Sequence, residues 1–159
     1  MNPVTTPLTV YKASAGSGKT FTLALEYIKL LILEPQNYRY ILAVTFTNKA
    51  TEEMKRRILS KLYDIAHALP GANDYMPALR TTFDRMTDED IRQRAGESMQ
   101  LILHNYNYFR VETIDSFFQS ILRNLARELG LKANLQVGLN DTEVESEAVD
   151  NIIENIQQD

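Results

Sequence analysis

Residues 8–20 read Leu-Thr-Val-Tyr-Lys-Ala-Ser-Ala-Gly-Ser-Gly-Lys-Thr, a short apolar run that leads directly into a glycine-rich turn. Gly16 and Gly18 give this turn the backbone freedom that it needs to bend around an anion. In such a turn, consecutive N–H groups converge on a phosphate, and the positive end of the following helix adds to the attraction. We therefore expect a phosphate-binding loop between a strand and a helix, with a nucleoside triphosphate, ATP above all, as its ligand.

The residues of this loop have distinct expected roles. The backbone of residues 14–18 should surround the phosphates, the Lys19 ammonium group should neutralise phosphate charge, and the Thr20 hydroxyl should hold Mg²⁺. One position departs from the general Walker A pattern, because Ala13 stands where glycine is usual. The expected phosphate-binding residues are Ser14, Ala15, Gly16, Ser17, Gly18, Lys19 and Thr20.

Three helices are expected to follow strands or turns of this kind. After the loop, apolar residues recur at spacings of three and four, which is typical of one buried helix face: Leu23, Ala24, Tyr27, Ile28 and Leu31. Residues 40–46 are a continuous apolar run, typical of a buried parallel strand, and Thr47 and Asn48 can cap the next helix. Its expected buried face is Ala50, Met54, Ile58, Leu62 and Ile65.

The third strand is separated from the second unit by a helical insertion. Residues 70–107 contain two expected helices, at about 74–86 and 87–104, and the second opens with a near capping box. Residues 109–113 then alternate like a strand, and a helix face follows that ends at Gly130. Repeated strand–turn–helix units predict an α/β fold with a parallel sheet and helices on both faces, whose ligands gather at the carboxyl ends of the strands.

Composition excludes several classes of protein. The chain has 159 residues, 44% of them hydrophobic, and its formal net charge is −4. No cysteine is present, so a disulfide framework and a Cys-ligated metal are excluded, and His67 and His104 each lack a second ligand at useful spacing. No apolar run approaches the ~20 residues of a membrane span, and no signal peptide is recognisable, so we expect a cytoplasmic protein without a membrane partner.

The charges are distributed unevenly along the chain. Residues 1–69 contain nine Lys or Arg against five Asp or Glu, whereas residues 133–159 contain seven acidic residues and no basic ones. An acidic protein of this kind is not expected to coat nucleic acid non-specifically. A local basic face in the first half can nevertheless contact phosphates.

Three segments resemble sequence motifs of one family, and they occur in its order. Ala13–Thr20, Ala43–Ala50 and Thr113–Phe117 are similar to motifs I, Ia and Ib of UvrD/Rep-type superfamily 1 DNA helicases. The insertion of about forty residues and Phe21, directly after Thr20, resemble the RecB/AddA branch of helicase-nucleases. The resemblance implies a RecA-like P-loop NTPase fold and, for the full-length protein, an ATP-dependent DNA helicase of recombination and repair.

The resemblance also implies roles for individual residues. Lys19 and Thr20 would serve ATP hydrolysis, and Phe21 would join the nucleotide-binding residues near the adenine, although simple helix packing is an equal alternative. Asp115 departs from the histidine usual in motif Ib, so it is not expected to touch DNA. Phe46 could instead cap the sheet. The residues expected to contact single-stranded DNA are Phe46, Thr47, Asn48, Thr113, Ser116 and Phe117.

The same resemblance suggests how the chain is divided and what it lacks. Residues 1–132 would be the N-terminal part of the ATP-binding domain, and residues 133–159 the start of an inserted helical subdomain. The Asp-Glu strand and arginine finger that hydrolysis requires are not recognisable, so the chain alone should bind ATP without turnover.

The expected partners are single-stranded or unwinding double-stranded DNA and a second helicase-nuclease subunit. An alternative stays open: a small self-contained P-loop kinase or regulatory NTPase with the insertion as a lid. Binding of single-stranded oligonucleotides would separate the two hypotheses.

Overall fold

The computed structural model describes residues 9–11 and 18–128 and places five helices and two strands in them. The chain divides into two units, of which the first ends at Phe117 and the second begins at Phe118, within the last described helix. The helices are α1 (Lys19–Leu33), α2 (Asn48–Ala66), α3 (Met76–Thr82), α4 (Asp88–His104) and α5 (Ile114–Glu128). The strands are β1 (Ala43–Thr45) and β2 (Val111–Thr113), and the 3₁₀ turns are η1 (Pro35–Arg39), η2 (Pro70–Ala72) and η3 (Tyr106–Tyr108).

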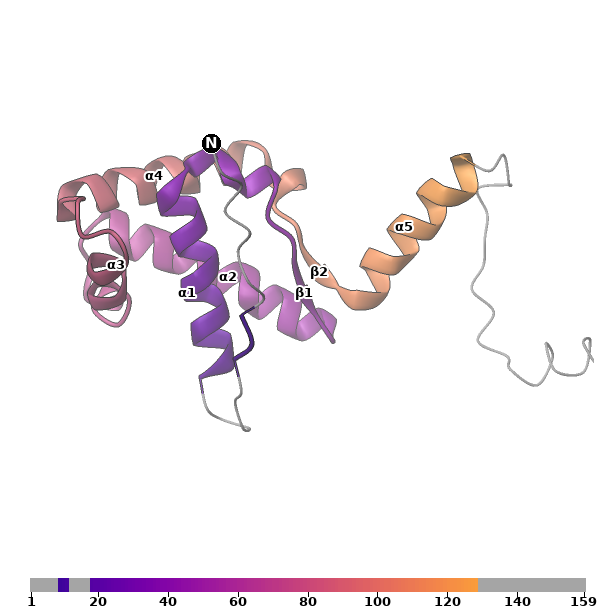
Figure 1. Cartoon of the computed structure of the whole chain (residues 1–159), viewed down its shortest axis with the longest axis horizontal. Helices are drawn as coiled ribbons and strands as arrows, with labels where there is room; N and C mark the ends of the chain where they lie inside the picture. Colours follow the sequence, from indigo (N-terminus) through magenta and orange to yellow (C-terminus); the bar gives the residue numbers. More distant parts are fainter. Residues whose placement is uncertain (1–8, 12–17, 129–159) are drawn as a thin grey trace, which may run out of the picture. The chain divides into compact units, whose positions relative to one another are not determined.

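The two strands form a parallel pair in which Ala43 lies opposite Val111 and Thr45 lies opposite Thr113. Because the strands are parallel and in register, they end at the same edge of the sheet. Figure 1 shows that α1 begins at the end of the first unit toward which both strands point. The expected parallel α/β arrangement is thus confirmed for the second and third strand–helix units.

The first expected strand is wrong for the residues that can be compared. Thr9, Val10 and Tyr11 form no strand, and Val10 and Tyr11 are 69% and 57% exposed. An extended segment becomes a strand only when a neighbour accepts its backbone hydrogen bonds. In the described part of the chain, β1 and β2 pair only with each other, so residues 9–11 have no strand to join.

The second expected strand is shorter than its apolar run suggests. Tyr40 ends η1 and is 84% exposed, and β1 begins only at Ala43. Ala43 and Val111 are buried, and both strands contact α2. Val44, which points to the opposite face, is 43% exposed. The described helices therefore do not bury both faces of the sheet, as the fold prediction required.

The core of the first unit is built mainly from α1, α2 and α4, which contact one another. The expected helix faces are confirmed except at their N-terminal members, since Leu23 is 42% exposed and Ala50 is exposed. Hydrophobic burial at spacings of three and four supplies most of the stability of such helices. The fully buried members are Ala24, Ile28 and Leu31 on α1, Ile58 and Leu62 on α2, and Ile91, Ala95 and Ile102 on α4.

Polar side chains of α4 also attach this helix to α1. The Arg94 guanidinium donates hydrogen bonds to the carbonyls of Ile32 (3.0 Å) and Leu33 (2.6 Å), which belong to the last turn of α1. The last carbonyls of a helix have no partner within the helix, so this arginine satisfies two of them. The buried Ser98 hydroxyl lies 3.3 Å from the Leu31 carbonyl and 2.7 Å from that of Arg94.

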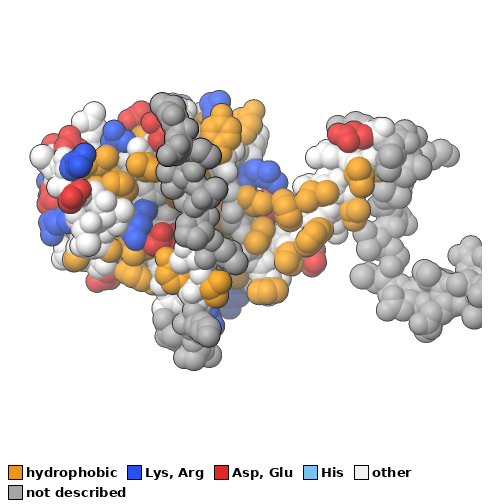
Figure 2. Space-filling model, viewed as in Figure 1, with side chains coloured by type: hydrophobic (Ala, Val, Ile, Leu, Met, Phe, Trp, Pro, Cys, Tyr) orange, Lys and Arg blue, Asp and Glu red, His pale blue; other side chains and the backbone are white. Residues whose placement is uncertain are grey.

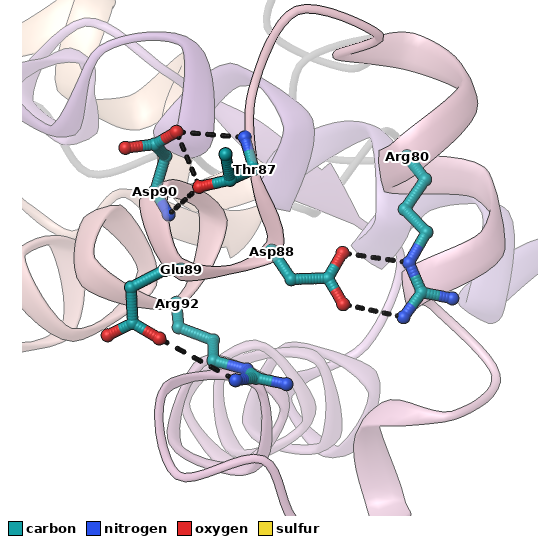
Figure 3. Close-up of polar contacts among 6 residues, drawn as sticks. All are labelled: Arg80, Thr87, Asp88, Glu89, Asp90 and Arg92. Carbon is teal, nitrogen blue, oxygen red and sulfur yellow. Dashed lines mark hydrogen bonds and ion pairs between the residues drawn. The ribbon is translucent and has the colours of Figure 1, made fainter.

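The expected helical insertion lies between α2 and β2, and its second helix begins as predicted. Thr87 caps α4 in a capping box: its hydroxyl accepts from the Asp90 N–H (3.2 Å), and the Asp90 carboxylate accepts from the Thr87 N–H (2.8 Å), as Figure 3 shows. A cap of this type contributes about 1 kcal/mol. Arg80 of α3 donates two hydrogen bonds, of 2.8 and 2.7 Å, to Asp88 of α4.

The Arg80–Asp88 pair makes the stability of the insertion depend on pH. The Arg80 hydrogen bonds hold the pKa of Asp88 below its usual range, so the unfolded chain binds this proton at higher pH than the folded one. The pair therefore stabilises the fold above about pH 4, and its contribution is lost as the pH falls through the folded-state pKa. Asp88→Asn should flatten the acid-induced fall of the urea midpoint between about pH 5 and pH 3.

The effect should be small, because both partners are partly exposed to solvent. The same titration in about 1 M salt is the control, since screening should weaken the pair in the parent chain and leave Asp88→Asn unaffected. Identical acid slopes in the parent and in Asp88→Asn at low salt would contradict the prediction.

Candidate nucleotide and nucleic-acid site

The start of α1 has the backbone geometry of a loop that turns sharply into a helix. Gly18 precedes the helix with φ 79° and ψ 15°, in the left-handed region, and its carbonyl accepts the first helical hydrogen bond from the Thr22 N–H (2.9 Å). A Cβ at Gly18 would meet no atom within 4 Å, so the requirement for glycine comes from the backbone angle and not from lack of space. The expected residues Ser14, Ala15, Gly16 and Ser17 lie outside the described residues.

The electrostatics at the start of α1 favour an anion. No side chain caps the helix at Gly18, and the first turn contains no acidic residue. The first N–H groups of a helix lack partners within the helix and carry its positive dipole end. Lys19 is exposed in this turn, and Thr20 beside it is partly buried. A cation, a hydroxyl and backbone donors thus occupy the same turn, as phosphate binding requires.

Phe21 packs against the helical insertion. Its ring centroid lies 4.6 Å from that of Tyr75, with the ring planes tilted by 55°. Tyr75 is buried, and burial raises the pKa of its hydroxyl, so this ring stays neutral. The contact agrees with the packing alternative for Phe21, while a contact with adenine stays a prediction. Sequence reasoning missed Tyr75, since nothing in the local pattern connects it with the start of α1.

Threonines fix the turn between β1 and α2. The Thr47 hydroxyl caps α2 by accepting from the Ala50 N–H (3.1 Å). The hydroxyls of Thr45 and Thr51 lie 2.7 Å apart, and each lies 3.2 Å from the Thr47 carbonyl. Between these anchored residues, the Phe46 side chain is 87% exposed. Phe46 therefore covers little of the sheet, and the turn presents its ring to solvent.

The turn between β2 and α5 is fixed in a similar way. The Thr113 hydroxyl accepts from the Ser116 N–H (3.2 Å) and lies 2.8 Å from the Ser116 hydroxyl. Thr113 is buried, Ser116 is exposed, and Phe117 is partly buried. Asp115 is exposed in the first turn of α5.

The two turns come together because their strands do. Thr45 and Thr113 are register partners, so the residues that follow them meet at one edge of the sheet. This edge brings together Phe46, Thr47, Asn48, Thr113 and Ser116 of the predicted nucleic-acid residues. We call it the Phe46 edge. The start of α1 lies at the same end of the first unit (Figure 1).

Other kinds of site find less support. Within residues 9–11 and 18–128, His, Cys, Asp and Glu side chains form no group of three that could hold a metal ion. The Nδ1 atoms of His67 and His104 lie 2.9 and 2.7 Å from the carbonyls of Tyr63 and Gln100, four residues earlier in each helix. No helix in the described part of the chain combines the length and apolar character that crossing a bilayer requires.

Comparison with known proteins gives one consistent result. The family model of the UvrD/REP helicase N-terminal domain matches residues 1–159. The chain is 30% identical over 151 residues to the RecBCD enzyme subunit RecB of Haemophilus influenzae, covering 86% of the chain and 12% of that protein. It is 31% identical over 143 residues to RecB of Escherichia coli, covering 82% of the chain and 12% of that protein.

A relative with another name has a similar level of identity. One of the subunits of the ATP-dependent helicase/nuclease of Bacillus cereus is 31% identical over 147 residues, which cover 89% of the chain and 10% of that protein. The chain thus spans only a small part of the length of the curated relatives it matches. No solved structure matches the chain.

Proposed function

The chain belongs to the family of UvrD/REP helicase N-terminal domains, on its RecB/AddA branch, and from this we propose that it binds ATP and single-stranded DNA within an ATP-dependent DNA helicase. The proposed setting is DNA recombination and repair in the cytoplasm, and the proposed protein partner is a second helicase-nuclease subunit. One observation carries the proposal most directly: the start of α1 and the Phe46 edge lie at the same end of the first unit.

The proposed nucleotide site uses the first turn of α1. Backbone N–H groups of this turn and the Lys19 ammonium group would face the phosphates, where Lys19 would neutralise the charge that develops during phosphoryl transfer. The Thr20 hydroxyl would hold Mg²⁺, an ion that prefers oxygen ligands and commonly remains bound to nucleotide phosphates. The absence of acidic residues from this turn supports the assignment, because a carboxylate there would repel the ligand.

The proposed DNA contact uses the Phe46 edge. An aromatic ring that is 87% exposed can stack on a base, and base stacking on such rings is tolerant of sequence. The Asn48 amide and the Ser116 hydroxyl are exposed beside it and can donate hydrogen bonds to a phosphate. The threonine anchors keep the turn in place, so little ordering should be needed when a strand binds.

The chain by itself is proposed to bind ATP without turning it over. Hydrolysis requires a second carboxylate-bearing strand that positions Mg²⁺ and water, and an arginine from another domain. The relatives that carry these activities in their names are far longer than this chain. Nucleotide binding and DNA binding are therefore the two activities that this chain should show alone.

Removing the Phe46 ring tests the DNA part of the proposal. Phe46→Ala should weaken binding of a short single-stranded oligonucleotide by about tenfold, because one stacked base loses its aromatic partner. Binding is measured by fluorescence anisotropy at low and at physiological salt, since the phosphate contribution depends on salt. Thermal unfolding should be nearly unchanged, because so exposed a ring contributes little to the core.

Two variants serve as controls. Phe46→Tyr keeps the ring and should retain affinity, whereas Tyr63→Ala removes a 47% exposed ring elsewhere on α2 and should have no effect. Unchanged binding in Phe46→Ala would remove the Phe46 edge as the DNA contact. Absence of any oligonucleotide binding by the parent chain would favour the kinase or regulatory NTPase hypothesis instead.

A further inference from the structure

The amino ends of β1 and β2 carry a group of exposed tyrosines. Tyr40 lies at the end of η1, just before β1, and Tyr106 and Tyr108 lie in η3, just before β2. Their side chains are 84%, 44% and 54% exposed. We call these three residues the tyrosine edge. It lies at the opposite end of the two strands from the Phe46 edge.

Cations lie over the rings of the tyrosine edge. The Arg39 guanidinium carbon is 5.4 Å from the centroid of the Tyr108 ring, and the Lys55 ammonium nitrogen is 5.4 Å from that of Tyr106. Arg39 is held by the hydrogen bond that its Nε donates to the Tyr38 hydroxyl (2.8 Å). The contacts join η1, η3 and α2 into one surface on which cations and aromatic rings alternate.

The positive charge of this surface is not neutralised by the protein residues around it. Among residues 9–11 and 18–128, no carboxylate lies within 4.0 Å of the charged groups of Arg39, Lys55 or Arg56. Arg110, in contrast, is paired with Glu112 at 2.7 Å and contributes little. Charges without partners at a surface attract counter-ions, and a phosphate chain is the counter-ion that also brings rings to stack.

A groove extends this surface along α2. It encloses about 480 Å³ and is lined by Tyr106, by the cations Lys55 and Arg56, and by one carboxylate, Glu52; Leu59 and Ser60 complete it. The groove gives the backbone of a bound strand a path past the exposed rings. Figure 2 shows hydrophobic and basic side chains next to each other at the end of the first unit where η1 and η3 lie in Figure 1.

We propose that the tyrosine edge and its cations bind a single-stranded nucleic acid, with bases stacked on Tyr106 and Tyr108 and phosphates near Lys55, Arg56 and Arg39. Rings interleaved with cations are the combination that single-stranded nucleic acids require. A protein partner would more commonly need a continuous apolar centre, which these residues do not provide. The site goes beyond the proposed function, because it lies at the other end of the strands and does not depend on Phe46.

The test compares oligonucleotides of two lengths by fluorescence anisotropy on the 159-residue chain. Tyr106→Ala with Tyr108→Ala should weaken binding of a strand of about 15 nucleotides by tenfold or more, because two stacked bases lose their partners. Lys55→Gln with Arg56→Gln should reduce the slope of log affinity against log salt by about 1.4, the value expected for two lost phosphate contacts. A strand of about 5 nucleotides should be less affected if it occupies the Phe46 edge first.

Matched variants separate binding from folding. Tyr106→Phe with Tyr108→Phe keeps both rings and should retain the affinity of the parent. Tyr63→Ala and Arg85→Gln remove an exposed ring and an exposed cation away from this surface and should leave binding unchanged. Ultraviolet cross-linking of an oligonucleotide with 5-iodouracil, followed by peptide mapping, should label the peptide that contains η3 in addition to the one that contains Phe46.

Each outcome decides between the two sites. Full affinity in the double alanine variant, or cross-links at the Phe46 peptide alone, overturns the tyrosine edge and leaves the proposed function intact. Cross-links at η3 alone, with Phe46→Ala unaffected, support the tyrosine edge and contradict the Phe46 edge. Displacement of the oligonucleotide from η3 by poly-glutamate at equal charge concentration would assign the surface to an acidic protein segment and overturn the proposal.

Discussion

Replacing Lys19 with alanine should weaken MgATP binding to the chain by about 100-fold, which corresponds to about 2.7 kcal/mol. The lysine lies in the first turn of α1, next to helix N–H groups and with no acidic residue in the same turn. Removing it leaves the phosphate charge with backbone donors alone, and a charged hydrogen bond to phosphate is among the strongest that a side chain makes. Calorimetric titration of parent and variant with MgATP measures the difference.

The variant chosen for comparison is another lysine of the same helix. Lys29 is paired with Glu26 at 2.7 Å and lies more than two turns from Gly18, so Lys29→Ala should bind MgATP like the parent. Equal affinity in Lys19→Ala and the parent would contradict the assignment of this turn to phosphate. Steady-state hydrolysis is measured on the same samples, and sustained turnover by the parent chain would contradict binding without turnover.

Replacing Leu62 with alanine should lower the free energy of unfolding by about 3 kcal/mol. Leu62 is fully buried on α2, the helix that contacts both α1 and α4. The loss has two parts, the transfer free energy of the missing methyl groups and the cavity that rigid neighbours cannot fill. A domain of this size has a total stability of about 5–15 kcal/mol, so the change is large enough to shift the urea midpoint clearly.

Leu103 of α4 provides the matched control, because it has the same side chain and is 56% exposed. Leu103→Ala should change the free energy of unfolding by no more than about 0.5 kcal/mol. A loss below about 1 kcal/mol in Leu62→Ala would show that the interface of α2 with its neighbours is looser than this structure describes. Circular dichroism at each urea concentration reports on α1, α2 and α4 together.

The helices could be predicted from the sequence because their signals are local. The spacing of Met54, Ile58, Leu62 and Ile65 describes one face of α2, and all four are buried. The capping box at Thr87 is likewise contained in four consecutive residues. The strand expected at residues 9–11 failed for the opposite reason, since a strand exists only when another segment pairs with it, and no local pattern shows that segment.

The candidate site divides along the same line. The positions of Phe46 and Thr113 at one edge follow from two parallel strands, which the strand–turn–helix repeats predicted. The contact of Phe21 with Tyr75 and the capping of α1 by Arg94 join residues more than fifty positions apart, and periodicity carries no information about such pairs. The tyrosine edge escaped for the same reason, because η1 and η3 are far apart in the sequence.

The contacts of α1 with the insertion also limit what the insertion can do. Near its start, α1 is held through Phe21 against Tyr75, and at its end through the Arg94 hydrogen bonds to Ile32 and Leu33. A helix fastened to its neighbour at both ends behaves like a splinted rod, so the insertion cannot swing over the nucleotide without breaking these fastenings. Any displacement that a phosphate imposes on the first turn of α1 would therefore be carried along the rod to α4.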